Sequence, residues 1–212
     1  MATVSNSRLN STRGHSAAER HLRKCHPRFR DLIRKIGPCP LEPNGEHYPL
    51  LVRTIVSQQL SVKAAASILR RVKDAAGEPG LTPNSVQKLT DEQLAACGLS
   101  RAKVRSLRDL SAQIMTRCLV LDDIHLLPDE AIAERLMQVH GIGPWSVDMF
   151  LIFALGRPDV LPVGDLGFRA AVREMFGLRK MPTPARITQL CEPWRPYRSV
   201  AAWYCWRLRD AK

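Results

Sequence analysis

Residues 136–146, which read LMQVHGIGPWS, constrain the fold of this 212-residue chain more than any other segment. They predict a helix, a tight Gly-Ile-Gly turn and a second helix that begins with a proline. Gly141 and Gly143 let the backbone turn sharply and come close to another molecule. Pro144 suits the first position of a helix, because its missing N–H is not needed there. Such a hairpin presents backbone N–H groups at a helix N-terminus, where a phosphate binds readily.

One carboxylate follows this hairpin at a short distance in the sequence. Asp165 comes 22 residues after Gly143, within residues 161–167, and begins the next helical segment. A phosphate-binding turn with one nearby acid predicts chemistry on a nucleic acid. A helix N-cap is the structural alternative for Asp165. Two other aspartates, Asp148 and Asp159, have the same type of side chain, and we interpret both as structural.

Charge is distributed unevenly along the chain, whose formal net charge is +12. Residues 1–47 carry 9 Lys and Arg against 4 Asp and Glu, a net of +5. Residues 169–212 carry 10 against 3, a net of +7, while residues 48–168 carry 13 of each. A neutral centre between two basic segments favours a polyanionic partner. A basic surface without a special partner is the alternative.

The cysteines and the apolar runs exclude several classes of protein. None of the six cysteines lies in a Cys-x-x-Cys pair; they are Cys25, Cys39, Cys97, Cys118, Cys191 and Cys205. This spacing predicts free thiols in a reducing compartment, without a zinc site or an iron–sulfur cluster. The polar N-terminus predicts no signal peptide, and the longest apolar run, 149–155, is too short to cross a bilayer.

Apolar residues recur at helical spacing along the chain, and no segment alternates with a period of two. The sequence therefore predicts an all-α fold with nine or ten helices. Residues 1–16 are expected to form a disordered tail. Helices are expected over residues 17–36, 48–76, 101–118, 129–139, 145–155, 165–176 and 198–209, with shorter ones capped by Thr90 and Gln93 and begun by Thr183 and Pro184.

The C-terminal region combines aromatic and basic side chains. It contains the stretch from Trp194 to Ser199, which reads WRPYRS, and then the stretch from Trp203 to Trp206, which reads WYCW. Aromatic side chains among arginines suit stacking on nucleic-acid bases. A place in the core or at its rim is the structural alternative for a single tryptophan such as Trp145 or Trp206.

Taken together, these motifs resemble a known family. The hairpin, Asp165 and the WRPYRS stretch occur with residues 55–65 (IVSQQLSVKAA) and 97–103 (CGLSRAK). This set is similar to 3-methyladenine DNA glycosylase II, of the helix-hairpin-helix DNA glycosylase superfamily, over about residues 20–209. The resemblance implies two helical subdomains with the active-site cleft between them. One would comprise residues 17–47 and 166–212, and the other residues 48–165 with the hairpin at 136–155.

The resemblance also implies roles for individual residues. Asp165 stands at the position of the catalytic aspartate, and Trp145 and Trp206 stand at aromatic positions that line the base pocket. The residues implied to bind DNA are Gly141, Gly143 and Ser146 in the hairpin and Gln59 and Leu60, one of which would fill the space left by a flipped base. The backbone carbonyls implied to hold a monovalent cation, Na⁺ or K⁺, are those of Met137, Val139 and Gly141. No cofactor is implied for catalysis.

The implied activity is hydrolysis of the N-glycosidic bond of alkylated bases, such as 3-methyladenine and 7-methylguanine, in double-stranded DNA during base excision repair. Trp145 stands where lyase members carry a lysine, so a monofunctional enzyme is expected. Leu166 and Met149 stand at positions that are aromatic in some relatives. Other lesions, such as hypoxanthine, ethenoadenine or uracil, are therefore an alternative, and a non-catalytic DNA-binding module is another. We expect a monomer without membrane contact, in the bacterial cytoplasm with the nucleoid or in a eukaryotic nucleus.

Overall fold

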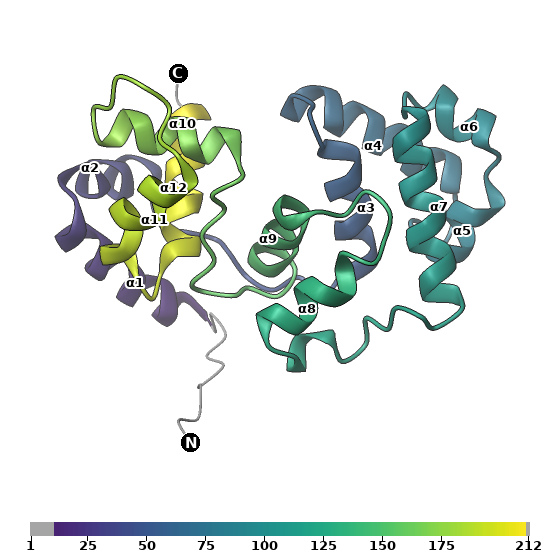
Figure 1. The fold of residues 1–212 in the computed structure, drawn as a ribbon, viewed down its shortest axis with the longest axis horizontal. Helices are drawn as coiled ribbons and strands as arrows, with labels where there is room; N and C mark the ends of the chain where they lie inside the picture. Colours follow the sequence, from purple (N-terminus) through teal and green to yellow (C-terminus); the bar gives the residue numbers. More distant parts are fainter. Residues whose placement is uncertain (1–10, 211–212) are drawn as a thin grey trace. The chain divides into compact units, whose positions relative to one another are not determined.

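The computed structural model describes residues 11–210, and all regular secondary structure in this range is helical, as Figure 1 shows. The helices form two compact units. The terminal unit comprises the described residues up to Asn44 and from Leu151 onward, and the central unit comprises Gly45–Phe150. The prediction of an all-α fold is confirmed.

The terminal unit combines helices from both ends of the sequence around an aromatic core. Its helices are α1 (Ser11–Cys25), α2 (Pro27–Ile36), α10 (Leu166–Met175), α11 (Pro184–Cys191), the 3-10 helix η2 (Glu192–Trp194) and α12 (Arg198–Asp210). The rings of Phe29 and Trp194 meet edge to face with centroids 5.1 Å apart. The Tyr204 hydroxyl donates to a carboxylate oxygen of Glu19, which joins α12 to α1. Such aromatic burial and buried hydrogen bonds hold the two chain ends in one core.

The central unit packs its helices around aliphatic side chains. Its helices are α3 (His47–Ser57), α4 (Val62–Ala76), α5 (Pro83–Lys88), α6 (Asp91–Ala96), α7 (Arg101–Met115), the 3-10 helix η1 (Ile124–Leu126) and α8 (Asp129–Leu136). Leu51, Ile55 and Leu107 are fully buried. The helix α9 (Pro144–Phe153) begins in this unit and ends in the terminal unit.

Polar side chains at helix N-termini explain where several helices begin. The Thr90 hydroxyl accepts from Gln93 N, and the Gln93 side chain accepts from Thr90 N, so the predicted capping box is confirmed. Thr183 likewise accepts from the third residue of α11, whose first residue is Pro184. Each contact satisfies an N–H group that the helix itself leaves without an acceptor.

Two predicted helices are interrupted. The prediction of one helix over residues 17–36 is wrong, because Pro27 begins α2 and the His26 ring accepts from the backbone N–H of Arg28. The prediction of one helix over residues 48–76 is also wrong, because α3 ends at Ser57 and Ser61 caps α4. Both helices of each pair bury an apolar face in the same unit, so the helical spacing of apolar residues runs across the break.

The ends of the predicted segments differ from the structure as well. Helix α1 begins at Ser11, so the predicted disordered tail of residues 1–16 is wrong in its last part; residues 1–10 lie outside the described residues. The predicted division after residue 165 differs from the compact units, which divide after residue 150. Residues 151–165 group with the terminal unit, where Asp159 binds Arg198 and Val160 N donates to the Ser199 hydroxyl. No helix within residues 11–210 is both long and apolar enough to cross a membrane.

Candidate functional site

The two hairpin glycines are required for different reasons. Gly141 has a φ of +80°, and a Cβ there would lie 2.2 Å from the Ser106 hydroxyl oxygen. Its place in the turn therefore needs a glycine. A Cβ on Gly143 would meet no atom of this protein within 4 Å. The missing side chain of Gly143 thus leaves open space beside the first turn of α9. Another molecule needs such space if it is to approach the backbone closely.

The start of α9 has the features of an anion site built from backbone groups. Backbone N–H groups of the first turn of a helix have no acceptor within the helix and carry the positive end of its dipole. Ser146 is only 2% exposed, and its hydroxyl accepts from the Gln58 amide at 3.1 Å. A phosphate contact of Ser146 would therefore use its backbone N–H rather than its hydroxyl.

The segment from Gln58 to Val62, which we name the plugging loop, joins α3 to α4 and carries both residues implied to replace a flipped base. Gln59 has a φ of +56°, a left-handed conformation that residues other than glycine adopt rarely. Gln59 is exposed, and the side chains of Leu60 and Val62 are exposed by 40% and 83%. The loop therefore presents apolar surface that the central unit does not bury, as a segment that enters DNA requires.

Asp165 lies in the terminal unit, where it is the N-cap of α10. Its Oδ1 accepts from Phe168 N at 2.6 Å and from Trp206 Nε1 at 2.8 Å. The N-cap that was the structural alternative is therefore present, and the carboxylate is half-buried as well. A Cβ on Gly167 would lie 3.2 Å from the same Oδ1. Two hydrogen bonds thus orient this carboxylate at a helix N-terminus, and the missing side chain of Gly167 leaves room for it.

Trp206 contacts Asp165 with its edge and another aromatic ring with its face. The ring stacks on Phe153 at 5.5 Å between centroids and 27° between planes. Both rings are half-buried. Phe153 did not stand out in the sequence, because it lies in the apolar run of α9 among residues that are mostly core. Within the terminal unit, the structure brings together Asp165, Trp206, Phe153 and Gly167.

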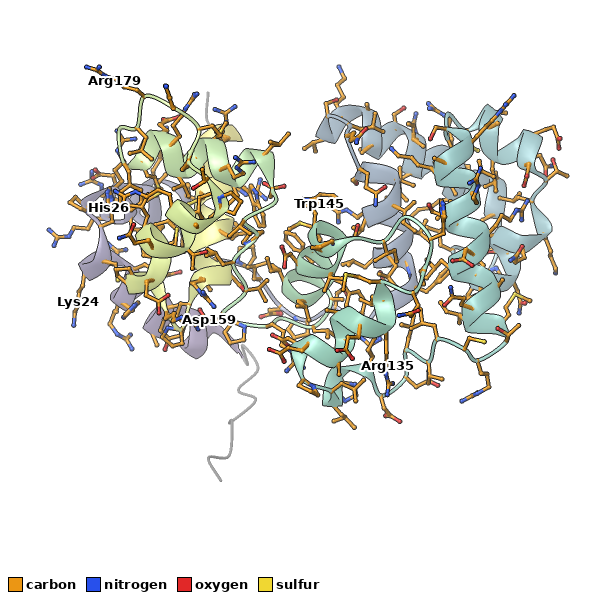
Figure 2. All side chains as sticks on the ribbon, in the orientation of Figure 1. Lys24, His26, Arg135, Trp145, Asp159 and Arg179 are labelled. Atoms are coloured by element: carbon orange, nitrogen blue, oxygen red, sulfur yellow. The ribbon has the colours of Figure 1, made fainter. Side chains whose placement is uncertain are left out.

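The other predicted pocket residue, Trp145, lies in the first turn of α9 and is half-buried (Figure 2). It belongs to the central unit, as do Gly141, Gly143, Ser146 and the plugging loop. Leu166 follows Asp165 directly and its side chain is 69% exposed, whereas Met149 is buried. Of the two positions at which some relatives are aromatic, Leu166 is thus the exposed one.

Trp194 and Arg198 of the WRPYRS stretch are buried and structural, so they offer no stacking surface for bases. Trp194 is 1% exposed and packs in the core of the terminal unit. Arg195 and Arg198 both bind the Asp159 carboxylate, each with a shortest distance of 2.7 Å. Trp203 is buried too, with the Arg207 guanidinium 5.2 Å from its ring centroid. The structural interpretation of Asp159 is confirmed.

The predicted cation ligands are backbone carbonyls, which suit hard cations because such ions prefer oxygen donors. Val139 O accepts from Ile142 N at 3.1 Å, and Gly141 O accepts from the Gln58 amide at 2.8 Å. A carbonyl oxygen has two lone pairs, so each keeps one for an ion. The donor set fits Na⁺ or K⁺, and the site stays a prediction. Among residues 11–210, no group of three His, Cys, Asp or Glu side chains could hold a metal ion.

The cysteine thiols are free, and most are removed from solvent. Cys39 and Cys191 are buried, and burial raises the pKa of each thiol to about 12. Burial raises the pKa of the Cys205 thiol as well. Cys118 is exposed. The buried thiols behave as small apolar side chains rather than as nucleophiles.

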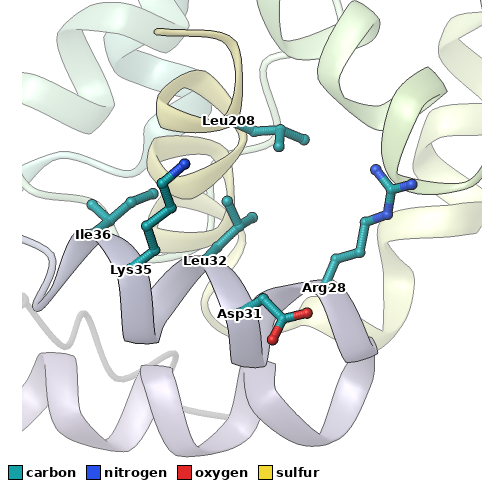
Figure 3. Close-up of a pocket in the computed structure, with 6 residues that line it drawn as sticks. All are labelled: Arg28, Asp31, Leu32, Lys35, Ile36 and Leu208. Carbon is teal, nitrogen blue, oxygen red and sulfur yellow. The ribbon is translucent and has the colours of Figure 1, made fainter. Parts of the chain in front are cut away.

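A shallow pocket between α2 and α12 contains none of the predicted site residues (Figure 3). Leu32, Ile36 and Leu208 form its apolar part, with Arg28 and Lys35 beside them. The Asp31 carboxylate in its lining binds Arg34 at 2.9 Å. The candidate functional residues are therefore Asp165 with its neighbours in the terminal unit and the hairpin with the plugging loop in the central unit.

Comparison with proteins of known sequence identifies the family of this chain. The model of the HhH-GPD superfamily, described as base excision DNA repair proteins, matches residues 52–196. A DNA-3-methyladenine glycosylase 1 from Schizosaccharomyces pombe is 34% identical over 90% of this chain and 86% of its own length. An alkylbase DNA glycosidase-like protein, mag2, from the same organism is 31% identical over 90% of this chain and 92% of its own length.

Comparison with solved structures extends the likeness to the fold. The Schizosaccharomyces pombe 3-methyladenine DNA glycosylase Mag1, solved in complex with abasic DNA, superposes with a TM-score of 0.84 at 33% identity, over 92% of this chain and 97% of that one. A 3-methyladenine DNA glycosylase from Archaeoglobus fulgidus, at 21% identity, shares the fold with a TM-score of 0.80. The region that the family model matches includes the hairpin, the plugging loop and Asp165. This chain belongs to the HhH-GPD superfamily of base excision DNA repair proteins.

Proposed function

We propose that this protein is a monofunctional DNA glycosylase that hydrolyses the N-glycosidic bond of alkylated bases, such as 3-methyladenine and 7-methylguanine, in double-stranded DNA. The observation that carries the proposal is the Asp165 carboxylate, oriented by Trp206 at the N-terminus of α10. The names of two relatives, a DNA-3-methyladenine glycosylase and an alkylbase DNA glycosidase-like protein, support the substrate class.

The hairpin of the central unit holds the DNA backbone. Gly143 leaves space for a phosphate beside the first turn of α9, whose N–H groups and dipole favour an anion. A monovalent cation on the carbonyls of Met137, Val139 and Gly141 would add positive charge next to that phosphate. These contacts read no sequence, so they suit a protein that finds damage anywhere in a genome.

The plugging loop stabilises the extrahelical base. Unstacking a nucleotide costs a few kcal/mol, and less when the base is damaged. Gln59 or Leu60 fills the vacated space and offsets part of this cost. Stacking of a positively charged alkylated base on an aromatic ring, that of Trp145 or that of Trp206, contributes about 0.5–2 kcal/mol through the cation–π attraction. An uncharged, undamaged base gains less from these rings.

Asp165 assists the cleavage of the bond. An alkylated purine carries a positive charge, so the bond from C1′ to the base nitrogen breaks with its electron pair going to the base, which leaves as a neutral molecule. Positive charge develops on the sugar, and the Asp165 carboxylate stabilises it electrostatically. Water then adds to C1′ and transfers a proton to the Asp165 carboxylate, which acts as the general base. The product is an abasic site.

The reaction stops at that product. A lyase step needs an amine that forms an imine with the sugar, and the hairpin position where lyase members carry a lysine is Trp145 in this chain. A strand break is therefore not part of the activity. Incubation of the product duplex with the protein is expected to leave both strands intact until alkali is added.

The test compares the wild type with Asp165→Asn on methylated duplex DNA. Release of free 3-methyladenine is expected to fall on the order of 100-fold, while binding to a duplex with an abasic-site analogue stays within a few-fold. Asp31→Asn, at an exposed position of α2, serves as the matched control and is expected to keep both properties. A wild-type protein that releases no methylated base would overturn the proposal.

A second substrate class is favoured by one observation. The exposed residue beside Asp165 is the aliphatic Leu166, so the pocket wall at that position does not select for a cationic base by stacking. A panel of duplexes with hypoxanthine, ethenoadenine and uracil tests whether neutral lesions are excised as well. Intact DNA binding with no excision from any substrate would leave a DNA-binding module.

The place of action follows from the substrate. We propose that the protein works as a monomer wherever chromosomal DNA lies, with the nucleoid in a bacterium or in the nucleus of a eukaryote. Its net charge of +12 favours association with DNA and makes the affinity depend on salt. Fractionation of cells with and without nuclease treatment, together with light scattering of the pure protein, tests this assignment.

A further inference from the structure

The plugging loop has a conformation that needs support from its surroundings. Gln59 is left-handed, and the loop before α4 is fixed by few backbone hydrogen bonds, among them Leu60 N to Ser57 O at 3.2 Å. Leu60 and Val62 are exposed and supply little packing. A strained backbone persists only when neighbouring groups hold it in place.

Lys103, in the first turn of α7, supplies one such hold. Its ammonium group donates to Val56 O and to Gln58 O, both at 2.8 Å. These carbonyls lie at the C-terminal end of α3, the negative end of its dipole, so a cation there is stabilising. Burial lowers the pKa of Lys103, which fits an ammonium group that has exchanged water for these carbonyls.

Gln58 supplies the second hold and joins the loop to the hairpin. Its side-chain nitrogen donates to Gly141 O at 2.8 Å and to the Ser146 hydroxyl at 3.1 Å. The first acceptor lies in the Gly-Ile-Gly turn and the second in the first turn of α9. A single amide group of the plugging loop thus contacts the residues on both sides of the proposed phosphate position, which is at Gly143 and Pro144.

The hairpin is held from the same helix as the loop. His140 N donates to Asp109 Oδ2 at 2.6 Å, and Ser106 packs against Gly141. Farther along α7, the Gln113 amide donates to Gln138 O at 3.2 Å. Positions spaced by three and four residues lie on one side of a helix. One polar side of α7 therefore contacts both DNA-binding segments; its residues are Lys103, Ser106, Asp109 and Gln113.

We propose that Gln58 is a positioning residue that, with this polar side of α7, locks the plugging loop to the phosphate-binding hairpin as one rigid surface. The inference rests on the proposed function, because it assigns the loop and the hairpin to DNA. A phosphate bound at Gly143 then fixes how far the residue at the loop tip reaches into the duplex. Gln58 itself touches no reacting atom, and it acts through the spacing of these two contacts.

The experiment compares Gln58→Leu with Gln87→Leu. Both substitutions remove a side-chain amide that donates to a backbone carbonyl of the central unit, since Gln87 donates to Arg108 O at 3.0 Å. Gln87 lies on α5, outside both DNA-binding segments. Gln58→Glu is the second variant, because it keeps the size and polarity of the side chain and replaces both N–H donors with an acceptor.

The first measurement is amide hydrogen exchange without DNA. Loss of the hydrogen bond to Gly141 O is expected to accelerate exchange about tenfold at residues 141–147 in both Gln58 variants, with no such change at these residues in Gln87→Leu. Unchanged exchange in the hairpin would overturn the proposal. This result does not depend on what the protein does to DNA, so it decides the proposal even if the proposed function fails.

The second measurement is the ratio of dissociation constants for undamaged duplex and for duplex with an abasic-site analogue. This ratio is expected to be about tenfold lower in the Gln58 variants than in the wild type. Gln87→Leu is expected to keep the wild-type ratio even if its thermal stability falls as much as that of the Gln58 variants. An unchanged ratio in the Gln58 variants would overturn the positioning role. A wild type without preference for abasic DNA would instead contradict the proposed function.

Discussion

The indole nitrogen of Trp206 lies 2.8 Å from Oδ1 of Asp165, while the face of the same ring stacks on Phe153. Trp206 therefore does two things at once: it provides aromatic surface, and it fixes the direction of the carboxylate. The sequence motif alone suggested only the first of these. The second follows from the fact that α12 and the N-terminus of α10 lie side by side in the terminal unit.

Replacing Trp206 with phenylalanine separates the two roles. The variant keeps an aromatic face for Phe153 and loses the N–H that holds Asp165. A hydrogen bond to a charged group contributes about 1.5–3 kcal/mol, so the single-turnover rate of base release is expected to fall about 10- to 100-fold. Binding to abasic-site duplex is expected to change little. Trp203→Phe, on the same helix, is the control; an equal loss of rate in both variants would contradict this role.

The two hairpin glycines are expected to respond differently to alanine. Gly141→Ala forces a left-handed alanine and is expected to destabilise the protein by about 1–3 kcal/mol. Gly143→Ala places its methyl group in open space and is expected to leave the free energy of unfolding nearly unchanged. It occupies the space of the phosphate, however, so the affinity for duplex DNA is expected to fall at least about tenfold. Urea unfolding and DNA titration at one fixed salt concentration measure both effects.

Asp159 is expected to matter for stability and not for chemistry. Its side chain is 22% exposed and binds Arg195 and Arg198, of which Arg198 is the more buried at 11%. Removing the carboxylate leaves a largely buried guanidinium without its counter-charge. Asp159→Ala is therefore expected to lower the free energy of unfolding by about 3 kcal/mol. At a temperature where the variant is folded, base release per folded molecule should match the wild type; a specific loss of activity would contradict the structural role.

Acid is expected to weaken the start of α2. Burial and the neighbouring Arg28 lower the pKa of His26, whose Nδ1 accepts from Arg28 N at 3.2 Å. The unfolded chain, with the ordinary histidine pKa of about 6.5, binds the proton more readily than the folded protein. The contribution of His26 to the free energy of unfolding is therefore fully present above about pH 6.5. It is lost as the pH falls toward the lowered pKa of the folded state.

The His26→Asn variant tests this dependence, because asparagine caps a helix well and does not titrate. The free energy of unfolding, measured in urea at about pH 7.5 and about pH 5.5, is expected to drop less in the variant than in the wild type. His47, whose pKa burial also lowers, contributes to the drop in both proteins. An identical pH dependence of the two proteins would show that the His26 cap does not titrate with folding.

The sequence predicted those structural features that depend only on residues close together in the chain. The capping box of Thr90 and the Thr183–Pro184 start are satisfied by atoms within three residues, so their spacing is visible in the chain. The Gly-Ile-Gly turn is predicted for the same reason, since Gly141 needs its positive φ wherever the helices pack. The breaks at His26 and at Gln58–Ser61 were missed because apolar spacing continues through them.

Contacts between distant segments could not be predicted from residue types. Gln58 and Gly141 lie far apart in the sequence, and only the fold of the central unit shows that one binds the other. The WRPYRS stretch was misread for the related reason that its arginines find Asp159, an acid from another segment. A buried Trp194 and a base-stacking tryptophan look the same in a sequence; their burial distinguishes them.

The burial of the cysteines affects how well this protein resists the alkylating agents that create its proposed substrate. Agents that methylate purines are electrophiles, and they attack thiolates as well. Cys39 and Cys191 are buried, and their pKa of about 12 keeps them as thiols at neutral pH. Both are sealed in the terminal unit, which also carries Asp165. The chemical attack that creates the proposed substrate therefore spares the interior of the protein that removes it.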